Sequence, residues 1–147
     1  MVWGGIAYGR RTQLHIIRES LNAIRYRDEI LPPQLVPFLQ QHNLTLQQDN
    51  ARPRVTRIST AYLQAHNIDV LPWPAFSTDP NPIEHLWDEL DRRVRRRDNP
   101  PSSVPKLEQT LLQEWNNIHQ MTVNNLINSM IRRVQSALEA NGRHTRY

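Results

Sequence analysis

The sequence contains no cysteine among its 147 residues and only one lysine, Lys106. The absence of thiols excludes a disulfide framework and any zinc site built on thiolates. No apolar run reaches the roughly 18 residues that a membrane-spanning helix needs, so we expect no membrane span. The N-terminal residues lack the basic region and long apolar stretch of a secretory signal. A glycine-rich phosphate loop is also absent, so we expect no nucleotide cofactor.

The net charge is positive, because 18 Lys and Arg residues face 14 Asp and Glu residues, which gives +4. Arginine carries nearly all of this positive charge, and its planar guanidinium matches the geometry of phosphate groups. The composition therefore favours nucleic acid as a partner. An ordinary basic surface in contact with solvent explains the same numbers, and composition alone leaves both interpretations open. The length predicts one domain that buries a substantial core.

The N-terminal part of the chain predicts a hairpin followed by a helix. Residues 1–7 and 12–17 are apolar or alternating runs on either side of a turn, which is typical of two antiparallel strands. Residues 22–41 carry apolar side chains at helical spacing. The prolines at positions 32, 33 and 37 lie inside this pattern, and we expect them to break or kink the helix.

The next part predicts a strand, a helix and a second strand. Residues 44–48 alternate and form a predicted short strand that ends at Asp49, and residues 52–54 are predicted to be a loop. Residues 58–65 have the apolar spacing of an amphipathic helix, and residues 68–71 form the second predicted strand. This order indicates a right-handed parallel crossover.

A helix start is predicted at residues 81–84. Asn81 suits the N-cap, Pro82 the first helical position, and Glu84 the third, which is close to a capping box. Glu84 therefore has a plain structural role as a capping residue. A carboxylate at a rigid helix start is also well placed to bind a metal ion.

Three helices are expected in the C-terminal half of the chain. The first begins at Asn81 and runs through the arginine cluster before Pro100. The others cover residues 107–118 and 123–138, and the last ends at Asn141-Gly142, a favourable C-terminal cap. The apolar stripes of these helices predict core positions for Trp87 and Trp115. The sequence therefore indicates an α/β part followed by C-terminal helices.

Asp49 and Glu84 are the candidate pair for chemistry. The two are separated by 34 residues, one at a strand end and the other in the first turn of a helix. Ligand sites in open α/β sheets gather at the carboxyl ends of strands, and two carboxylates there need a cation between them. Oxygen ligands prefer magnesium or manganese over zinc. On spacing alone, an ordinary surface aspartate and a capping glutamate are the more common explanation.

The amino-acid sequences of the two segments resemble those of one enzyme family. Gln48-Asp49-Asn50-Ala51, together with Trp73-Pro74, Ser77, Asp79 and the run from Asn81 to Trp87, closely resembles the catalytic domain of mariner-superfamily transposases of the Tc-type branch. The similarity extends over essentially the whole chain, from Met1–Gly5 to Gly142–Tyr147. It implies a ribonuclease H-like fold in a single domain, with an α/β part in residues 1–98 and C-terminal helices in residues 99–147. It also implies Mg²⁺ or Mn²⁺, with Asp49 and Glu84 as the second and third metal-binding catalytic carboxylates.

The resemblance also implies what the chain lacks. The family's first catalytic aspartate lies on a strand upstream of the segment that matches Met1, together with helix-turn-helix DNA-binding domains. We therefore expect an N-terminally truncated domain without its first strand. Asp28 lies in a predicted helix and is a poor substitute. Arg54 stands where relatives carry histidine, and Thr78 and Pro80 where proline and leucine are usual. A cation at position 54 would compete with metal ions.

The expected partner is DNA, at transposon ends. The candidate phosphate contacts are five arginines, namely Arg52, Arg54, Arg95, Arg96 and Arg97. For the last three, a solvated helix end favoured by the helix dipole is an equally good interpretation. A homodimer is left open, and the expected compartment is the nucleus.

These observations lead to two main functional hypotheses. The first is a transposase-derived domain related to cut-and-paste transposition, inactive alone because the first metal-binding aspartate is absent, that retains DNA binding. The alternative is an active metal-dependent strand-transfer nuclease, completed by an upstream segment or a partner chain. A third hypothesis is an unstable pseudogene product without a role, which a cooperative thermal unfolding transition would contradict.

Overall fold

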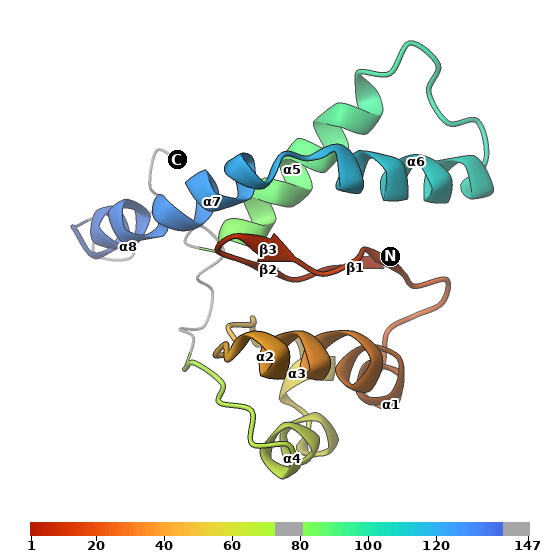
Figure 1. The fold of residues 1–147 in the computed structure, drawn as a ribbon. Helices are drawn as coiled ribbons and strands as arrows, with labels where there is room; N and C mark the ends of the chain where they lie inside the picture. Colours follow the sequence, from red (N-terminus) through yellow and green to blue (C-terminus); the bar gives the residue numbers. More distant parts are fainter. Residues whose placement is uncertain (73–80, 140–147) are drawn as a thin grey trace. The chain divides into compact units, whose positions relative to one another are not determined.

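The computed structural model describes residues 1–72 and 81–139 (Figure 1). The chain forms two compact units, each with its own buried core. The first contains Met1–Gly4 and His15–Ser77, and the second contains Gly5–Leu14 and Thr78–Tyr147. The predicted division of the domain after residue 98 stays a prediction.

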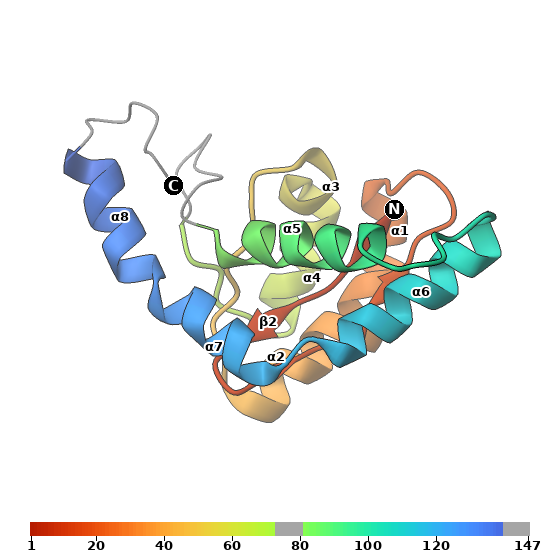
Figure 2. The same cartoon turned by 90° about the horizontal axis from the view of Figure 1, so that it is seen from above.

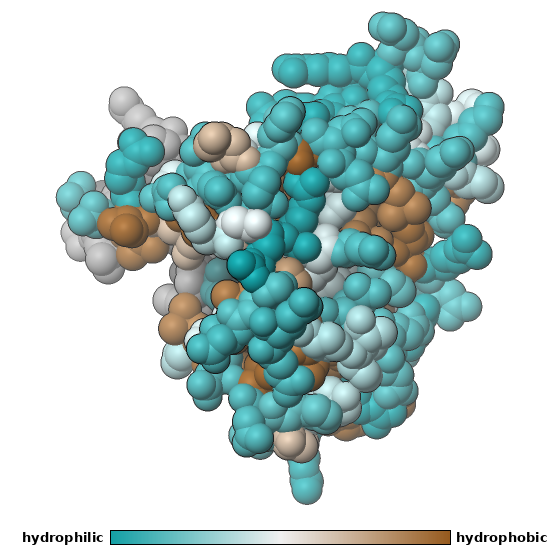
Figure 3. Space-filling view, viewed as in Figure 1, coloured by the Kyte–Doolittle hydropathy of each residue, from teal (hydrophilic) through white to brown (hydrophobic). Residues whose placement is uncertain are grey.

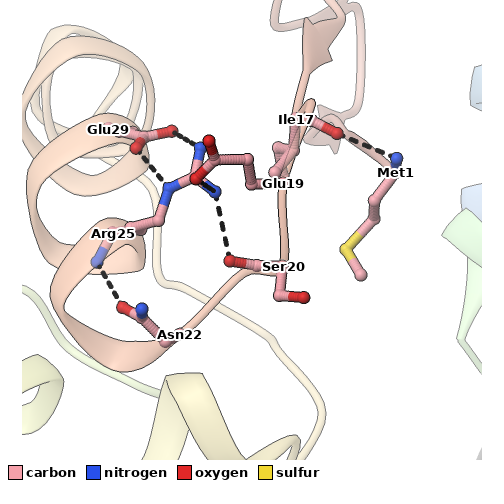
Figure 4. Close-up of polar contacts among 7 residues, drawn as sticks. All are labelled: Met1, Ile17, Glu19, Ser20, Asn22, Arg25 and Glu29. Atoms are coloured by element: carbon pink, nitrogen blue, oxygen red, sulfur yellow. Dashed lines mark hydrogen bonds and ion pairs between the residues drawn. The ribbon is translucent and has the colours of Figure 1, made fainter.

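The first unit begins with an antiparallel strand pair and continues with helices. Its elements are β1 (Val2–Trp3), β4 (His15–Ile16), α1 (Ala23–Arg25), the π-helix η1 (Tyr26–Leu35), α2 (Val36–His42), α3 (Arg52–Val55) and α4 (Arg57–Ala65). Val2 pairs with Ile16 and Trp3 with His15. The Met1 ammonium donates to the Ile17 carbonyl at 2.9 Å (Figure 4). These pairings confirm the predicted hairpin.

The predicted helix over residues 22–41 is continuous, although it contains three prolines. The Asn22 side chain caps it by accepting from the Arg25 N–H at 2.9 Å (Figure 4). Pro32 and Pro33 lie inside η1, where the Val36 N–H donates to the Leu31 carbonyl five residues earlier. A proline clashes with the carbonyl four residues before it, and the wider π-type turn relieves that clash. The helix does not break at these prolines but widens instead, whereas the alternative of a kink stays a prediction.

An ion pair fastens the start of this helix to the preceding loop. The Glu29 carboxylate accepts two hydrogen bonds from Arg25, at 2.6 and 3.0 Å. The same guanidinium donates to the Ser20 carbonyl at 3.2 Å (Figure 4). The hydrogen bond from Arg25 lowers the pKa of Glu29. The loop and the first helical turns are thus held as one piece.

The two predicted strands are reduced to a single parallel bridge. Leu46 pairs with Val70, since the Leu46 N–H donates to the Asp69 carbonyl at 2.9 Å and the Leu71 N–H donates to the Leu46 carbonyl at 2.8 Å. Neither segment extends into a strand beyond this bridge, and α3 and α4 lie between the two segments in the sequence. The right hand of the crossover stays a prediction. The loop predicted at residues 52–54 is wrong, because they belong to the one-turn helix α3. Pro53 favours this turn through its fixed φ at the helix start.

The core of the first unit surrounds the long helix. It consists of the buried residues Trp3, Ile17, Tyr26, Ile30, Leu31, Leu35, Val36, Leu39, Leu46, Leu63 and Ile68. Tyr26 is 1% exposed, and its hydroxyl donates to the Gln48 side-chain carbonyl at 2.9 Å. Burial raises the pKa of Tyr26 to about 12, an effect that the nearby Arg54 partly offsets. The phenol is therefore a neutral hydrogen-bond donor over the physiological pH range.

The second unit combines the tip of the hairpin with the C-terminal helices. Its elements are β2 (Ile6–Ala7), β3 (Arg10–Arg11), α5 (Pro82–Arg95), α6 (Val104–Asn117), α7 (Gln120–Asn128) and α8 (Met130–Glu139). β2 and β3 are antiparallel, and Gly9 in their turn has a φ of +78°, which favours glycine. The Gly9 N–H donates to the Asn124 side-chain oxygen at 2.8 Å. The turn is thereby attached to α7.

The helix α5 starts as its sequence predicts. The Asn81 side chain accepts from the Ile83 N–H at 3.3 Å, and Pro82 occupies the first turn. Asn81 is therefore confirmed as the N-cap. The helix ends at Arg95, before the predicted stop at Pro100. α5 packs against α6 and α7 (Figures 1 and 2), and its residues Leu86, Leu90 and Val94 are buried.

Trp115 anchors the hairpin tip to α6. Its side chain is 1% exposed, and the indole N–H donates to the Thr12 carbonyl at 3.0 Å. Trp87 stacks on it with ring centroids 5.3 Å apart. The predicted core position is confirmed for Trp115, whereas Trp87 is only partly buried. Arg11 donates to the carbonyls of Ile118, at 2.6 Å, and Asn116, at 3.0 Å. These bonds satisfy carbonyls at the end of α6, which an α-helix leaves without internal partners.

The single helix predicted over residues 123–138 is two helices, α7 and α8, with Ser129 between them. The Ser129 hydroxyl donates to the Leu126 carbonyl at 2.7 Å, a local bond that competes with the regular helix ladder. The predicted cap at Asn141-Gly142 lies outside the described residues. No helix in the described part of the chain is long and apolar enough to cross a membrane. Hydrophilic side chains predominate on the face shown in Figure 3.

The different burial of two leucines predicts different losses of stability when each is replaced by alanine. Leu86 is 0% exposed, so Leu86→Ala leaves a cavity and should lower the free energy of unfolding by about 2 to 5 kcal/mol. Leu112 on α6 is 39% exposed, and Leu112→Ala should cost less than about 1 kcal/mol. Urea unfolding followed by circular dichroism measures both. Equal losses in the two variants would contradict this assignment of the core.

The buried Tyr26 predicts a loss of stability at alkaline pH. Its pKa of about 12 exceeds the usual value of about 10, so the neutral phenol stabilises the fold below pH 10, and this contribution falls as the pH rises towards 12. The two-unit difference corresponds to about 3 kcal/mol. Tyr26→Phe should remove this pH dependence in unfolding measurements between pH 9 and about 12. Tyr8→Phe, which removes a tyrosine that is 61% exposed, is the matched control.

Candidate functional site

Asp49 lies just after the bridged segment at Leu46 and is fixed by two contacts. One of its carboxylate oxygens, Oδ1, accepts from the Ala51 N–H at 2.9 Å. The same oxygen forms an ion pair with the Arg54 Nη1 at 2.8 Å. The Asp49 side chain is 44% exposed and that of Arg54 is 27% exposed. The carboxylate therefore lies at the surface of the first unit with a guanidinium against it.

The position of Arg54 follows from the short helix that carries it. α3 is capped by the Ala51 carbonyl, which accepts from the Arg54 N–H at 2.9 Å. The buried Ser59 of α4 donates its hydroxyl to the Pro53 carbonyl at 2.6 Å. These bonds hold α3 against α4. The guanidinium is thus presented to Asp49 by a fixed turn.

The sequence pattern does not single out Tyr26, and Gln48 stands out only as part of the family motif. Gln48 accepts the Tyr26 hydroxyl, and the charges of Arg54 and Asp49 both act on the pKa of Tyr26, which places the phenol close to this ion pair. The available signal was the spacing of Tyr26 four residues before the buried Ile30, which puts a polar hydroxyl on an apolar helical face. Tyr26 and Gln48 together position the backbone that carries the carboxylate.

Glu84 lies in the first turn of α5, and its backbone N–H donates to the Asn81 carbonyl at 3.3 Å. Its side chain is exposed. Glu84 belongs to the second unit and Asp49 to the first. That the two bind a metal ion together therefore remains a prediction. The predicted capping contact of the Glu84 side chain also remains a prediction.

Within residues 1–72 and 81–139, no group of three or more His, Cys, Asp or Glu side chains could hold a metal ion. An oxygen of Asp49 is engaged by a guanidinium, which brings positive charge where a metal ion would bind.

The five predicted DNA-contacting arginines differ in how they are engaged. Arg95 pairs with Asp91 at 2.7 Å, a hydrogen bond that raises the pKa of Arg95. Arg97 pairs with Glu114 at 2.7 Å and also donates to Gln113. The Arg97 pair is the more buried of the two, since the Glu114 side chain is only 12% exposed, against 59% for Asp91. Arg97 thus fastens the end of α5 to α6, whereas the exposed pair of Arg95 holds only weakly.

Arg52 and Arg96 are exposed, and neither forms an ion pair within the described part of the chain. Arg52 lies on α3, and Arg96 follows α5 directly. To bind a phosphate group, these two arginines do not have to break an ion pair with any of the described residues. The other three of the five predicted DNA-contacting arginines do. Arg52 and Arg96 are the strongest candidates of the five.

No protein-family model matches the chain, but individual proteins resemble it in sequence. The Tc1 transposase of Caenorhabditis elegans is 32% identical over 152 aligned residues, which cover 100% of this chain and 54% of the transposase. The chain therefore spans about half the length of this relative. The match nevertheless extends from one end of the chain to the other.

Solved structures show the same fold. The catalytic domain of Mos1 transposase, in a structure with raltegravir and Mn, superposes with a TM-score of 0.76 at 20% identity, over 99% of this chain and 82% of that domain. A Mos1 transposase paired-end complex with the left transposon end gives a TM-score of 0.74 at 19% identity, over 93% of this chain and 45% of that protein. At these identities the likeness concerns the fold, and it confirms the predicted ribonuclease H-like α/β class.

The relationship thus rests on two independent comparisons, one of sequence and one of fold. Both cover nearly the whole chain, and both lead to the same group of proteins. The chain is homologous to the Tc1 and Tc3 transposases, and it has the fold of the Mos1 transposase catalytic domain.

Proposed function

We propose that this chain is a transposase-derived domain that binds DNA at transposon ends and does not cleave or join DNA by itself. The match of the whole chain to about half of the Tc1 transposase carries the proposal, because it relates the chain to cut-and-paste transposition. Mos1 transposase, which shares the fold, forms a paired-end complex with a transposon end. The relevant compartment is the nucleus, where chromosomal DNA is found.

DNA binding is supported by the charge of the chain and by its exposed arginines. The net charge of +4 favours a polyanionic partner. Arg52 and Arg96 present guanidinium groups without ion pairs in the described residues, and guanidinium binds phosphate in two-point geometry. Arg95 contributes after it releases the exposed Asp91, whereas Arg97 remains bound to Glu114.

Independent catalysis is disfavoured by the surroundings of Asp49. Two-metal phosphodiester chemistry needs several oxygen ligands around each ion, and the described residues supply no group of three. The Mos1 catalytic domain has been solved with Mn and with Mg, which supports these ions as the metals of the homologous site. We propose that Asp49 and Glu84 bind such an ion only when an upstream segment or a partner chain, such as a second copy, supplies further ligands.

Salt-dependent DNA binding tests the first part of the proposal. Arg52→Gln and Arg96→Gln should each lower the slope of log Kd against log salt concentration by about 0.9 for every phosphate group that the arginine neutralises. Fluorescence anisotropy with a short DNA duplex measures this slope. Lys106→Gln removes one positive charge outside the predicted interface and serves as the control. Slopes that match the wild type in both arginine variants would exclude these residues from the interface.

Strand-transfer assays test the second part. The chain incubated with a pre-cleaved transposon end and Mn²⁺ should give no joined product on a denaturing gel, because its described residues do not complete a metal site. A manganese-dependent product that disappears in Glu84→Ala would refute the inactive assignment and favour the enzyme.

A further inference from the structure

The carboxylate of Asp49 and the guanidinium of Arg54 close a short loop of the chain. Oδ1 of Asp49 is 2.8 Å from Nη1 of Arg54 and also accepts the Ala51 N–H at 2.9 Å. Both donors come from the five residues that follow Asp49 in the sequence. The carboxylate is thus neutralised by its own immediate neighbourhood, without help from the rest of the unit.

The turn that carries Arg54 is rigid for several local reasons. Pro53 has a fixed φ, and its carbonyl accepts the hydroxyl of the buried Ser59 at 2.6 Å. Thr56 caps α4 by accepting the Ser59 N–H. The guanidinium is therefore held near Asp49 by packing, which reduces the entropy cost of the ion pair relative to a free surface arginine.

The side-chain oxygen of the neighbouring Gln48 also accepts a hydrogen bond. The side-chain carbonyl of Gln48 accepts the hydroxyl of the buried Tyr26 at 2.9 Å. Two oxygen atoms that a hard cation would seek at this strand end, one from Gln48 and one from Asp49, thus already accept hydrogen bonds. A metal ion arriving at Oδ1 would have to displace the guanidinium and would be repelled by its charge.

We propose that Arg54 acts as the internal counter-ion of Asp49 and closes this carboxylate to divalent metal ions. Opening requires that the guanidinium move to another anion or be replaced. This proposal goes beyond the proposed DNA binding. Because its test contains no DNA, the metal proposal and the DNA-binding proposal can fail independently of each other.

Manganese titration of the full chain tests the proposal. Isothermal titration calorimetry gives the Kd, and paramagnetic broadening of backbone amide signals at residues 48–51 locates the ion. Arg54→Gln should bind Mn²⁺ about tenfold more tightly than the wild type, because a charge that repels the ion is gone. Arg52→Gln removes an equal charge from the same short helix without a contact to Asp49, and it should leave the Kd unchanged.

Two further variants make the result specific. Asp49→Asn combined with Arg54→Gln should lose the gained affinity and the local broadening. Arg54→Lys keeps the charge and should bind no more tightly than the wild type. Arg54→Met replaces Arg54→Gln if the latter fails to give a folded spectrum. The proposal is overturned if neutralising Arg54 has no more effect than neutralising Arg52, or if the gain survives the loss of Asp49.

Discussion

The hydrogen bond from the Tyr26 hydroxyl to Gln48 joins two segments of the first unit, and the position of Asp49 depends on both. Tyr26 belongs to the long helix in the core, and Gln48 belongs to the segment that ends at Asp49. Because the phenol is buried, this bond forms in surroundings where an unpaired hydroxyl would be costly. This bond therefore ties the segment that leads to Asp49 to the core helix.

Arginine serves two purposes in this chain, and its abundance reflects both. Arg11 covers the end of α6, Arg25 holds a loop to a helix, and Arg97 holds α5 to α6. These guanidinium groups act as internal ties, in places where other folds use hydrophobic contacts or thiol chemistry. The positive charge offered to a polyanion is therefore smaller than the arginine content suggests.

The sequence predicts helices well where their ends carry clear chemical signals. Asn81 and Pro82 mark the start of α5, and the apolar spacing of residues 58–65 marks α4. The prediction fails where one local bond alters a regular pattern. The π-type widening at Pro32 and the hydroxyl bond of Ser129 involve few atoms, and a periodic pattern does not contain them. At the site, Asp49 is a candidate by position, but its pairing with Arg54 depends on the short turn of α3, where the sequence pattern predicts a loop.

The π-helix has a consequence for how this segment evolves. A π-type turn holds more residues than an α-type turn, so η1 rotates the side chains of α2 about the helix axis relative to those of α1. Val36 and Leu39 face the core in this rotated frame. A one-residue deletion between Tyr26 and Leu35 would rotate those two side chains by about 100° about the helix axis, away from the core. A homologue with α-type turns in this segment is therefore expected either to carry a deletion here or to place different residues in these core positions.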